Sequence, residues 1–78
     1  MDCAKIEKLM LRNRPDELVQ EIRLYKREGR FKSLLNDHNF GGGTYTFLQQ
    51  LVKVSSPHTV IDVIKYIQDN LNDEYFER

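Results

Sequence analysis

Apolar residues recur every three or four positions along most of this chain, a spacing that predicts short amphipathic helices. The pattern is interrupted around Pro15 and Gly29, so residues 1–12, 15–28 and 30–39 are expected to form three separate helices. The expected core positions are Cys3, Ile6, Leu9 and Met10 in the first helix, Leu18, Ile22 and Tyr25 in the second, and Phe31, Leu34, Leu35 and His38 in the third.

Local signals define the ends of the second helix. Pro15 suits a first turn because its missing N–H would have no helical partner there. Asp16 and Glu17 place negative charge at the positive end of the helix dipole. Gly29 is expected to end the helix in the left-handed conformation, which glycine adopts at no steric cost.

The most regular helix is expected at the C-terminal end of the chain. Ser55 and Ser56 offer an N-cap, and Pro57 then fits the first helical position. The apolar stripe that follows spans about 120° of the helix surface. Its expected members are Val60, Val63, Ile64, Ile67, Leu71 and Tyr75.

The segment 44–54 is ambiguous between helix and strand. Tyr45 and Phe47 alternate with threonines, which suits a strand, whereas the residues from Phe47 to Leu51 fit a helix better. Plotted helically, the polar residues of this segment occupy a narrow arc, as in a central and well-buried helix. We favour the helix, with Thr44 as its N-cap.

The predicted fold class is therefore all-α. We expect residues 1–78 to form a single domain, a compact bundle of four or five short helices. The alternative is an α+β fold with a hairpin spanning about residues 31–54, packed against the outer helices.

The composition fits an intracellular globular protein. The chain has 78 residues, of which 40% are apolar and 31% are charged, and Cys3 is its one cysteine. A reducing compartment, and hence a cytoplasmic location, is expected because extracellular domains of this size usually carry several cysteines. Charges interrupt the apolar positions of residues 1–13, so no signal peptide is expected, and no stretch approaches the roughly 20 apolar residues that span a bilayer.

Charge is unevenly divided along the chain, although the formal net charge is zero. Residues 1–32 hold nine Lys and Arg against six Asp and Glu, a balance of +3, and residues 33–78 hold three against six, a balance of −3. Such asymmetry is typical either of a partner surface or of two helix faces that attract each other. The cations concentrate in residues 23–32.

This basic segment is the main candidate for a binding surface. Its five cations interleave with Tyr25 and Phe31, a combination that can grip phosphates and stack on bases. The two aromatic residues fall on the apolar stripes, however, and the chain as a whole is not basic. An acidic protein surface is therefore the favoured partner, and nucleic acid is the alternative.

The glycine run Gly41, Gly42 and Gly43 has two interpretations. Successive N–H groups of a glycine loop before a helix can bind a phosphate or carboxylate. Neither a Gly-Lys-Ser/Thr sequence nor a Gly-x-Gly-x-x-Gly sequence accompanies the run. We therefore favour a flexible connector, acting as the hinge between the helices before and after it.

Catalysis finds little support in the sequence. Cys3, His38 and His58 are the residues available for a thiol–imidazole pair, and nothing in their spacing brings them together. No spacing of a zinc site is present, and a bundle of this size leaves scarcely any interior for a pocket. We expect a non-enzymatic protein with no metal and no cofactor.

The favoured function is that of a small regulator, inhibitor or adaptor that docks on a larger protein. Leu24 lies off its core stripe, and Tyr75 and Phe76 form an aromatic end to the chain. Apolar anchors beside a cationic rim are typical of protein interfaces, and homodimerisation would use the same features. The candidate partner-binding residues are Arg23, Leu24, Lys26, Arg27, Arg30, Lys32, Tyr75 and Phe76.

Overall fold

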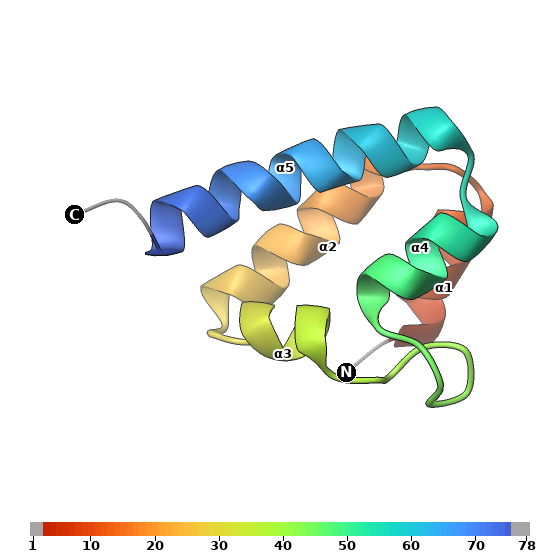
Figure 1. Cartoon of the computed structure of the whole chain (residues 1–78), viewed down its shortest axis with the longest axis horizontal. Coiled ribbons are helices and arrows are strands. Elements are labelled where there is room, and N and C mark those ends of the chain that lie inside the picture. The colour runs from red at the N-terminus through yellow and green to blue at the C-terminus, as the bar shows by residue number, and fades with distance from the viewer. Residues whose placement is uncertain (1–2, 76–78) are drawn as a thin grey trace.

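A computed structural model describes the backbone of residues 3–75 and the side chains of residues 3–70. These residues form five helices (Figure 1). The helices are α1 (Cys3–Leu11), α2 (Pro15–Arg27), α3 (Phe31–Asn36), α4 (Phe47–Val54) and α5 (Pro57–Tyr75). The prediction of an all-α bundle is confirmed.

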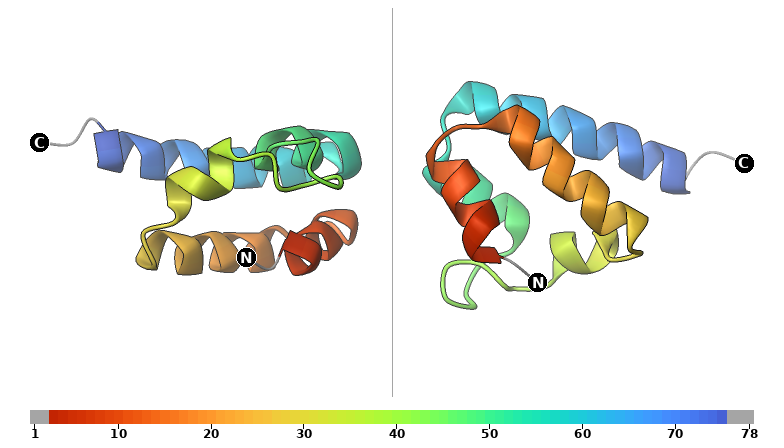
Figure 2. Two further views of the ribbon diagram at one scale, coloured as in Figure 1. Left: turned by 90° about the horizontal axis from the view of Figure 1, so that it is seen from below. Right: turned by 180° about the vertical axis from the view of Figure 1, so that it is seen from behind.

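The helices lie in two layers. In the view from below, α1 and α2 form one layer, α4 and α5 form the other, and α3 leads from the first to the second (Figure 2). Both α2 and α4 pack against α1, α3 and α5. The molecule is accordingly flat, with extents of 36 × 25 × 17 Å. Helices in the two layers thus bury their inner faces against each other and leave their outer faces to solvent.

Left-handed residues end the first two helices. Gly29 has φ +75°, and the N–H of Arg30 donates to the carbonyl of Tyr25 at 2.8 Å, which completes the expected glycine cap. Asn13 plays the same part after α1 with φ +55°. Its side-chain Oδ1 accepts a hydrogen bond from the backbone N–H of Ser56 at 2.6 Å. The end of α1 is thereby tied to the start of α5.

One continuous core fills the space between the layers. The predicted stripes of α1 and α2 lie in it, as do two residues from α5 and one from the connection that contains the glycines. The buried apolar residues are Ile6, Leu9, Met10, Leu18, Ile22, Tyr25, Phe31, Leu34, Phe40, Phe47, Leu51, Val63 and Ile67. Every described helix therefore contributes to a single core.

The glycine run forms a tight loop directly after a buried aromatic residue. Gly41, Gly42 and Gly43 have φ values of +60°, +74° and +91°, which side-chain-bearing residues rarely adopt. Phe40 and Tyr45 close the loop with two backbone hydrogen bonds of 3.0 and 2.8 Å, an isolated antiparallel bridge. The loop thus reverses the chain within a few residues and leaves the fully buried ring of Phe40 in the core.

The α+β alternative is wrong. The bridge between Phe40 and Tyr45 is the one strand-like pairing among the described residues, and 31–36 and 47–54 are helical. The helix in this segment starts later than expected, because Thr46 rather than Thr44 is the N-cap. Thr46 accepts a hydrogen bond from the N–H of Gln49 and its own N–H donates to the Gln49 side chain, a capping box.

One expected core residue and one side of a helix that was expected to be buried lie at the surface. His38 follows the end of α3 and is exposed. The chain leaves helical geometry at Asp37, so His38 does not share the buried face of α3. Helix α4 is not buried on all sides. Its residues Leu48 and Val52 are exposed, since α1, α3 and α5 cover one face of it and no described element covers the other.

Replacing Gly41 by alanine should destabilise the fold more than the same change at Gly42. Both positions have positive φ, so each alanine costs about 1–2 kcal/mol in backbone energy. A Cβ at Gly41 would also collide with the ring of Tyr45, whereas a Cβ at Gly42 meets nothing within 4 Å. The collision should add about 1–3 kcal/mol. Urea denaturation followed by circular dichroism measures both variants, and equal free energies of unfolding would contradict the packed loop.

Thr46→Ala should lower the free energy of unfolding by about 1 kcal/mol, because it removes the N-cap of α4. Thr44→Ala is the matched control, since Thr44 is exposed and lies outside the helix. Thermal or urea denaturation of the two variants compares them directly. A larger loss for Thr44→Ala would show that the helix begins at the earlier threonine.

Candidate functional site

The exposed apolar side chain of α2 lies among charged neighbours, as the sequence predicted. Leu24 is 44% exposed, whereas Ile22 two positions earlier is fully buried. Leu24 lines a shallow surface hollow of about 240 Å³. The other residues lining this hollow, which we call the α2 surface, are Gln20, Glu21, Arg23 and Arg27. Three of the predicted partner-binding residues thus meet at one concave place.

Two cations of the basic segment turn toward α5. The guanidinium of Arg23 lies 5.7 Å from the centre of the Tyr66 ring, a cation–π contact. The ammonium of Lys26 donates a hydrogen bond to Oδ1 of Asn70. Both contacts cross from one layer to the other, and both α5 partners are uncharged. α5 therefore positions the positive charges of Arg23 and Lys26 through these uncharged partners, and no ion pair joins either cation to a described side chain of α5.

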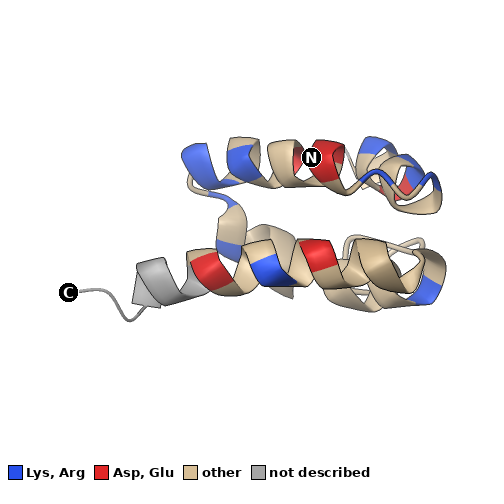
Figure 3. Ribbon diagram, turned by 90° about the horizontal axis from the view of Figure 1, so that it is seen from above, with Lys and Arg blue, Asp and Glu red and all other residues tan. Residues whose placement is uncertain are grey.

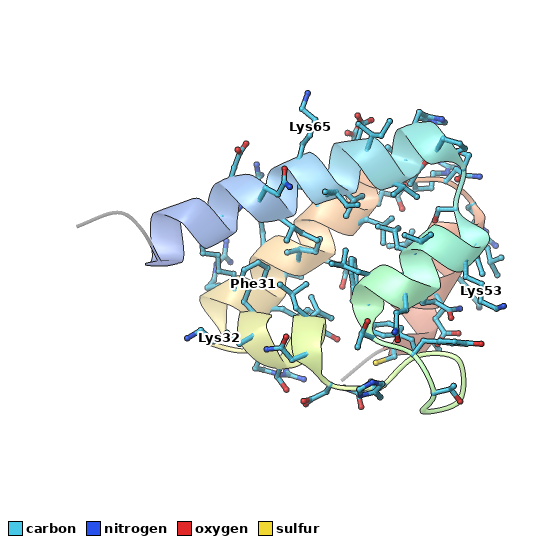
Figure 4. All side chains as sticks on the ribbon, in the orientation of Figure 1. Phe31, Lys32, Lys53 and Lys65 are labelled. Atoms are coloured by element: carbon cyan, nitrogen blue, oxygen red, sulfur yellow. The ribbon has the colours of Figure 1, made fainter. Side chains whose placement is uncertain are left out.

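The remaining cations of the segment spread over the α2–α3 end of the molecule (Figure 3). Arg30 lies 5.0 Å from the centre of the Tyr25 ring and forms an ion pair with Glu28 at 2.8 Å. Arg27 is exposed and makes no hydrogen bond or ion pair with a described residue. Lys32 is exposed on α3, at the opposite end of the molecule from Lys53 (Figure 4).

The aromatic residues of the basic segment belong to the core. Tyr25 and Phe31 are 6% and 3% exposed, so neither ring presents a face on which a base could stack. The predicted partner-binding residues Tyr75 and Phe76 lie outside the part of the chain whose side chains are described. The α2 surface therefore presents the aliphatic side chain of Leu24 with the polar and charged side chains around it, and no aromatic ring lines it.

A second hollow, which the sequence did not predict, lies on the outer side of α4. It has a volume of about 460 Å³. Its lining residues, which we call the α4 surface, are Tyr45, Leu48, Gln49, Val52 and Lys53. The ammonium of Lys53 lies 5.5 Å from the centre of the Tyr45 ring. This hollow is larger and more apolar than the one on α2.

One sequence signal would have located the start of α4. The pattern Thr46-x-x-Gln49 is a capping box, and it fixes the start of the helix at Phe47. When the helix starts at Phe47, Phe47 and Leu51 lie four positions apart on the buried face. Leu48 and Val52 each follow one of them by one residue and lie together on an adjacent, exposed face.

The glycine loop does not present a ring of unused N–H groups. The N–H groups of Gly43, Thr44 and Tyr45 all approach the carbonyl of Phe40, at 3.1, 2.9 and 2.8 Å. The N–H of Gly41 donates to a carboxylate oxygen of Glu7 at 3.1 Å. Donors that are satisfied within the protein are not available to hold a phosphate, and the hinge role of Gly41, Gly42 and Gly43 stays a prediction.

Within the described part of the chain, no group of three or more His, Cys, Asp and Glu side chains could hold a metal ion. None of the helices described here combines the length and the apolar character needed to cross a bilayer. No family model matches the chain, and no curated protein sequence or solved structure is significantly similar to it.

Leu24→Asp should leave the fold intact. Its exposed side chain predicts a loss of less than about 1 kcal/mol, most of it from the weaker helix propensity of Asp. Ile22→Asp is the contrasting variant on the same helix, because it buries a charge without a partner and should unfold the chain. Circular dichroism during heating measures both. If Leu24→Asp also unfolds the protein, Leu24 is a core residue and cannot anchor a partner.

Proposed function

We propose that this chain is a small, non-catalytic protein-binding regulator, inhibitor or adaptor that docks on an acidic surface of a larger protein through its α2 surface. Leu24 supplies the apolar anchor, and Arg23 and Arg27 supply the cationic rim around it. Lys26, Arg30 and Lys32 extend the positive charge toward α3.

The observation that carries this proposal is the positive charge around an exposed leucine, which no ion pair with a described residue of 33–70 neutralises. The ion pairs Lys5–Glu21, Arg14–Glu17 and Arg30–Glu28 each join two members of residues 1–32, so they leave the balance of +3 in that part unchanged.

On the α5 side, Arg23 and Lys26 meet a tyrosine and an asparagine rather than carboxylates. The charge asymmetry had an alternative explanation, an attraction between basic and acidic helix faces. These two contacts of Arg23 and Lys26 are not of that kind, because neither involves a carboxylate.

An acidic protein fits this surface better than nucleic acid does. Proteins that bind single strands combine cations with exposed aromatic rings, and both aromatic rings of the basic segment are buried. Arginine beside an exposed apolar side chain is instead typical of a protein interface, where arginine is enriched and polar groups form the rim.

The proposal can be tested with a pair of matched double variants. Leu24→Asp with Arg27→Glu alters the α2 surface, and Ile61→Asp with Lys65→Glu makes the same chemical changes on α5. Ile61 is 57% exposed, and Lys65 points away from the bundle (Figure 4). Each protein is immobilised, incubated with nuclease-treated lysate of the source cells, and analysed by mass spectrometry at two salt concentrations.

We expect a protein that binds the wild type and the α5 variant but binds the α2 variant at least about tenfold less. Its binding should weaken as salt increases, because the rim contacts are exposed charges. Capture that is equal for all three chains would contradict the proposal. Salt-dependent binding of purified duplex or single-stranded oligonucleotides, lost in Arg23→Glu with Arg27→Glu, would favour nucleic acid instead.

A further inference from the structure

Helix α4 has apolar side chains on two faces but is covered on one. Phe47 and Leu51 are fully buried on the inner face. On the other side, Leu48 is 36% and Val52 is 62% exposed. A helix whose surface is largely apolar is normally enclosed by other elements, whereas no described element covers this second face of α4.

The positions on this outer face follow the spacing at which helices contact one another. Leu48, Gln49, Val52 and Lys53 of α4 stand at i, i+1, i+4 and i+5, and Tyr45 lies just before the helix. They line a hollow of about 460 Å³, with one ring at its start and aliphatic side chains along it. A helix that rests in such a groove inserts its own side chains at the same spacing.

Lys53 gives the hollow its electrostatic character. It lies over the Tyr45 ring and forms no ion pair with a described residue. The sequence between Asp37 and Asp62 contains no Asp or Glu, so the segment carries no carboxylate of its own near this ammonium. A ligand that brings a carboxylate next to an apolar group would complement both features.

We propose that the α4 surface is a second docking site, and that its occupant is a short amphipathic helix of a partner protein. The apolar side chains of that helix rest on Leu48 and Val52, and an Asp or Glu one turn away pairs with Lys53. Eight residues of α4 extend about 12 Å, so the groove accommodates roughly two turns of the partner helix.

A second copy of this chain fits the surface less well. Pairing two α4 surfaces would bring two Lys53 ammonium groups into one interface whose own segments hold no carboxylate. On the α4 surface, the exposed apolar side chains are those of Leu48 and Val52. Two such side chains are a small contact area, because a stable dimer buries about 800 Å² on each partner. A small apolar patch with one cation is instead the size expected for a peptide segment.

This site is distinct from the one proposed above, because α2 and α4 lie in different layers (Figure 2). The basic segment and Lys53 are likewise at opposite ends of the molecule, as the positions of Lys32 and Lys53 show (Figure 4). Two partners could therefore be held at once, as in an adaptor.

The test uses the full chain and a phage library of random peptides about 12 residues long, roughly three helical turns. Phage are selected on the immobilised wild type after removal of those that bind the bare support. Affinities of the selected peptides are then measured by fluorescence polarisation for the wild type, Val52→Asp, Lys53→Glu and Ile61→Asp. Ile61 is an exposed aliphatic residue on α5 and serves as the matched control for Val52.

Selected peptides should carry a large apolar residue with Asp or Glu three or four positions away. Val52→Asp should weaken binding at least about tenfold, Lys53→Glu should weaken it about two- to fivefold, and Ile61→Asp should not change it. A peptide whose carboxylate is replaced by lysine should bind Lys53→Glu better than the wild type, a reversal that a folding defect does not produce.

Three results would overturn the proposal. The first is the absence of any enriched peptide. The second is an enriched set without carboxylates, or one whose affinity is indifferent to Val52→Asp and Lys53→Glu. The third is a wild-type dimer in light scattering that Val52→Asp converts to a monomer, since a second copy would then cover the face. The α2 surface is untouched by these variants, so neither proposal stands or falls with the other.

Discussion

The tight loop that follows the buried Phe40 is the constraint on which the second half of the structure depends. The ring is fully buried and meets Phe47 edge-on, with 5.8 Å between the ring centres. Its carbonyl is approached by three N–H groups of the loop, and this geometry requires positive φ at three successive residues. Only glycine adopts such a run at low cost, so the three glycines allow an aromatic core residue within a tight turn.

This turn determines where α4 can lie. Because Phe40 and Phe47 are in contact, the start of α4 is held against the core directly after the loop, and Glu7 of α1 accepts a hydrogen bond from Gly41. The next helix, α5, packs against α2, and the contacts of Arg23 and Lys26 join these two helices. No described helix remains to cover the outer side of α4, and the exposure of Leu48 and Val52 follows from that.

The features predicted correctly from the sequence are those that local interactions decide. Pro15, Gly29 and the stripes of α1 and α2 depend on backbone preferences and on periodicity within one helix, and the structure agrees with them. Periodicity identified α4 as apolar all round but gave no information about which neighbours exist to cover it. The burial expected for that helix was therefore wrong, because coverage is a property of the whole bundle.

The same distinction applies to the two candidate surfaces. The α2 surface could be predicted because Leu24 lies off its own stripe, which is visible within a single helix. The α4 surface could not, since its hollow combines the helix with Tyr45, a residue placed by the glycine loop. Tyr45 pairs with Phe40 on its backbone and contacts Lys53 through its ring, so it links the packed loop to the proposed docking site. A change at Gly41 that displaces the Tyr45 ring should consequently alter the α4 hollow as well as the stability of the loop, while leaving Leu24 and Arg27 in place.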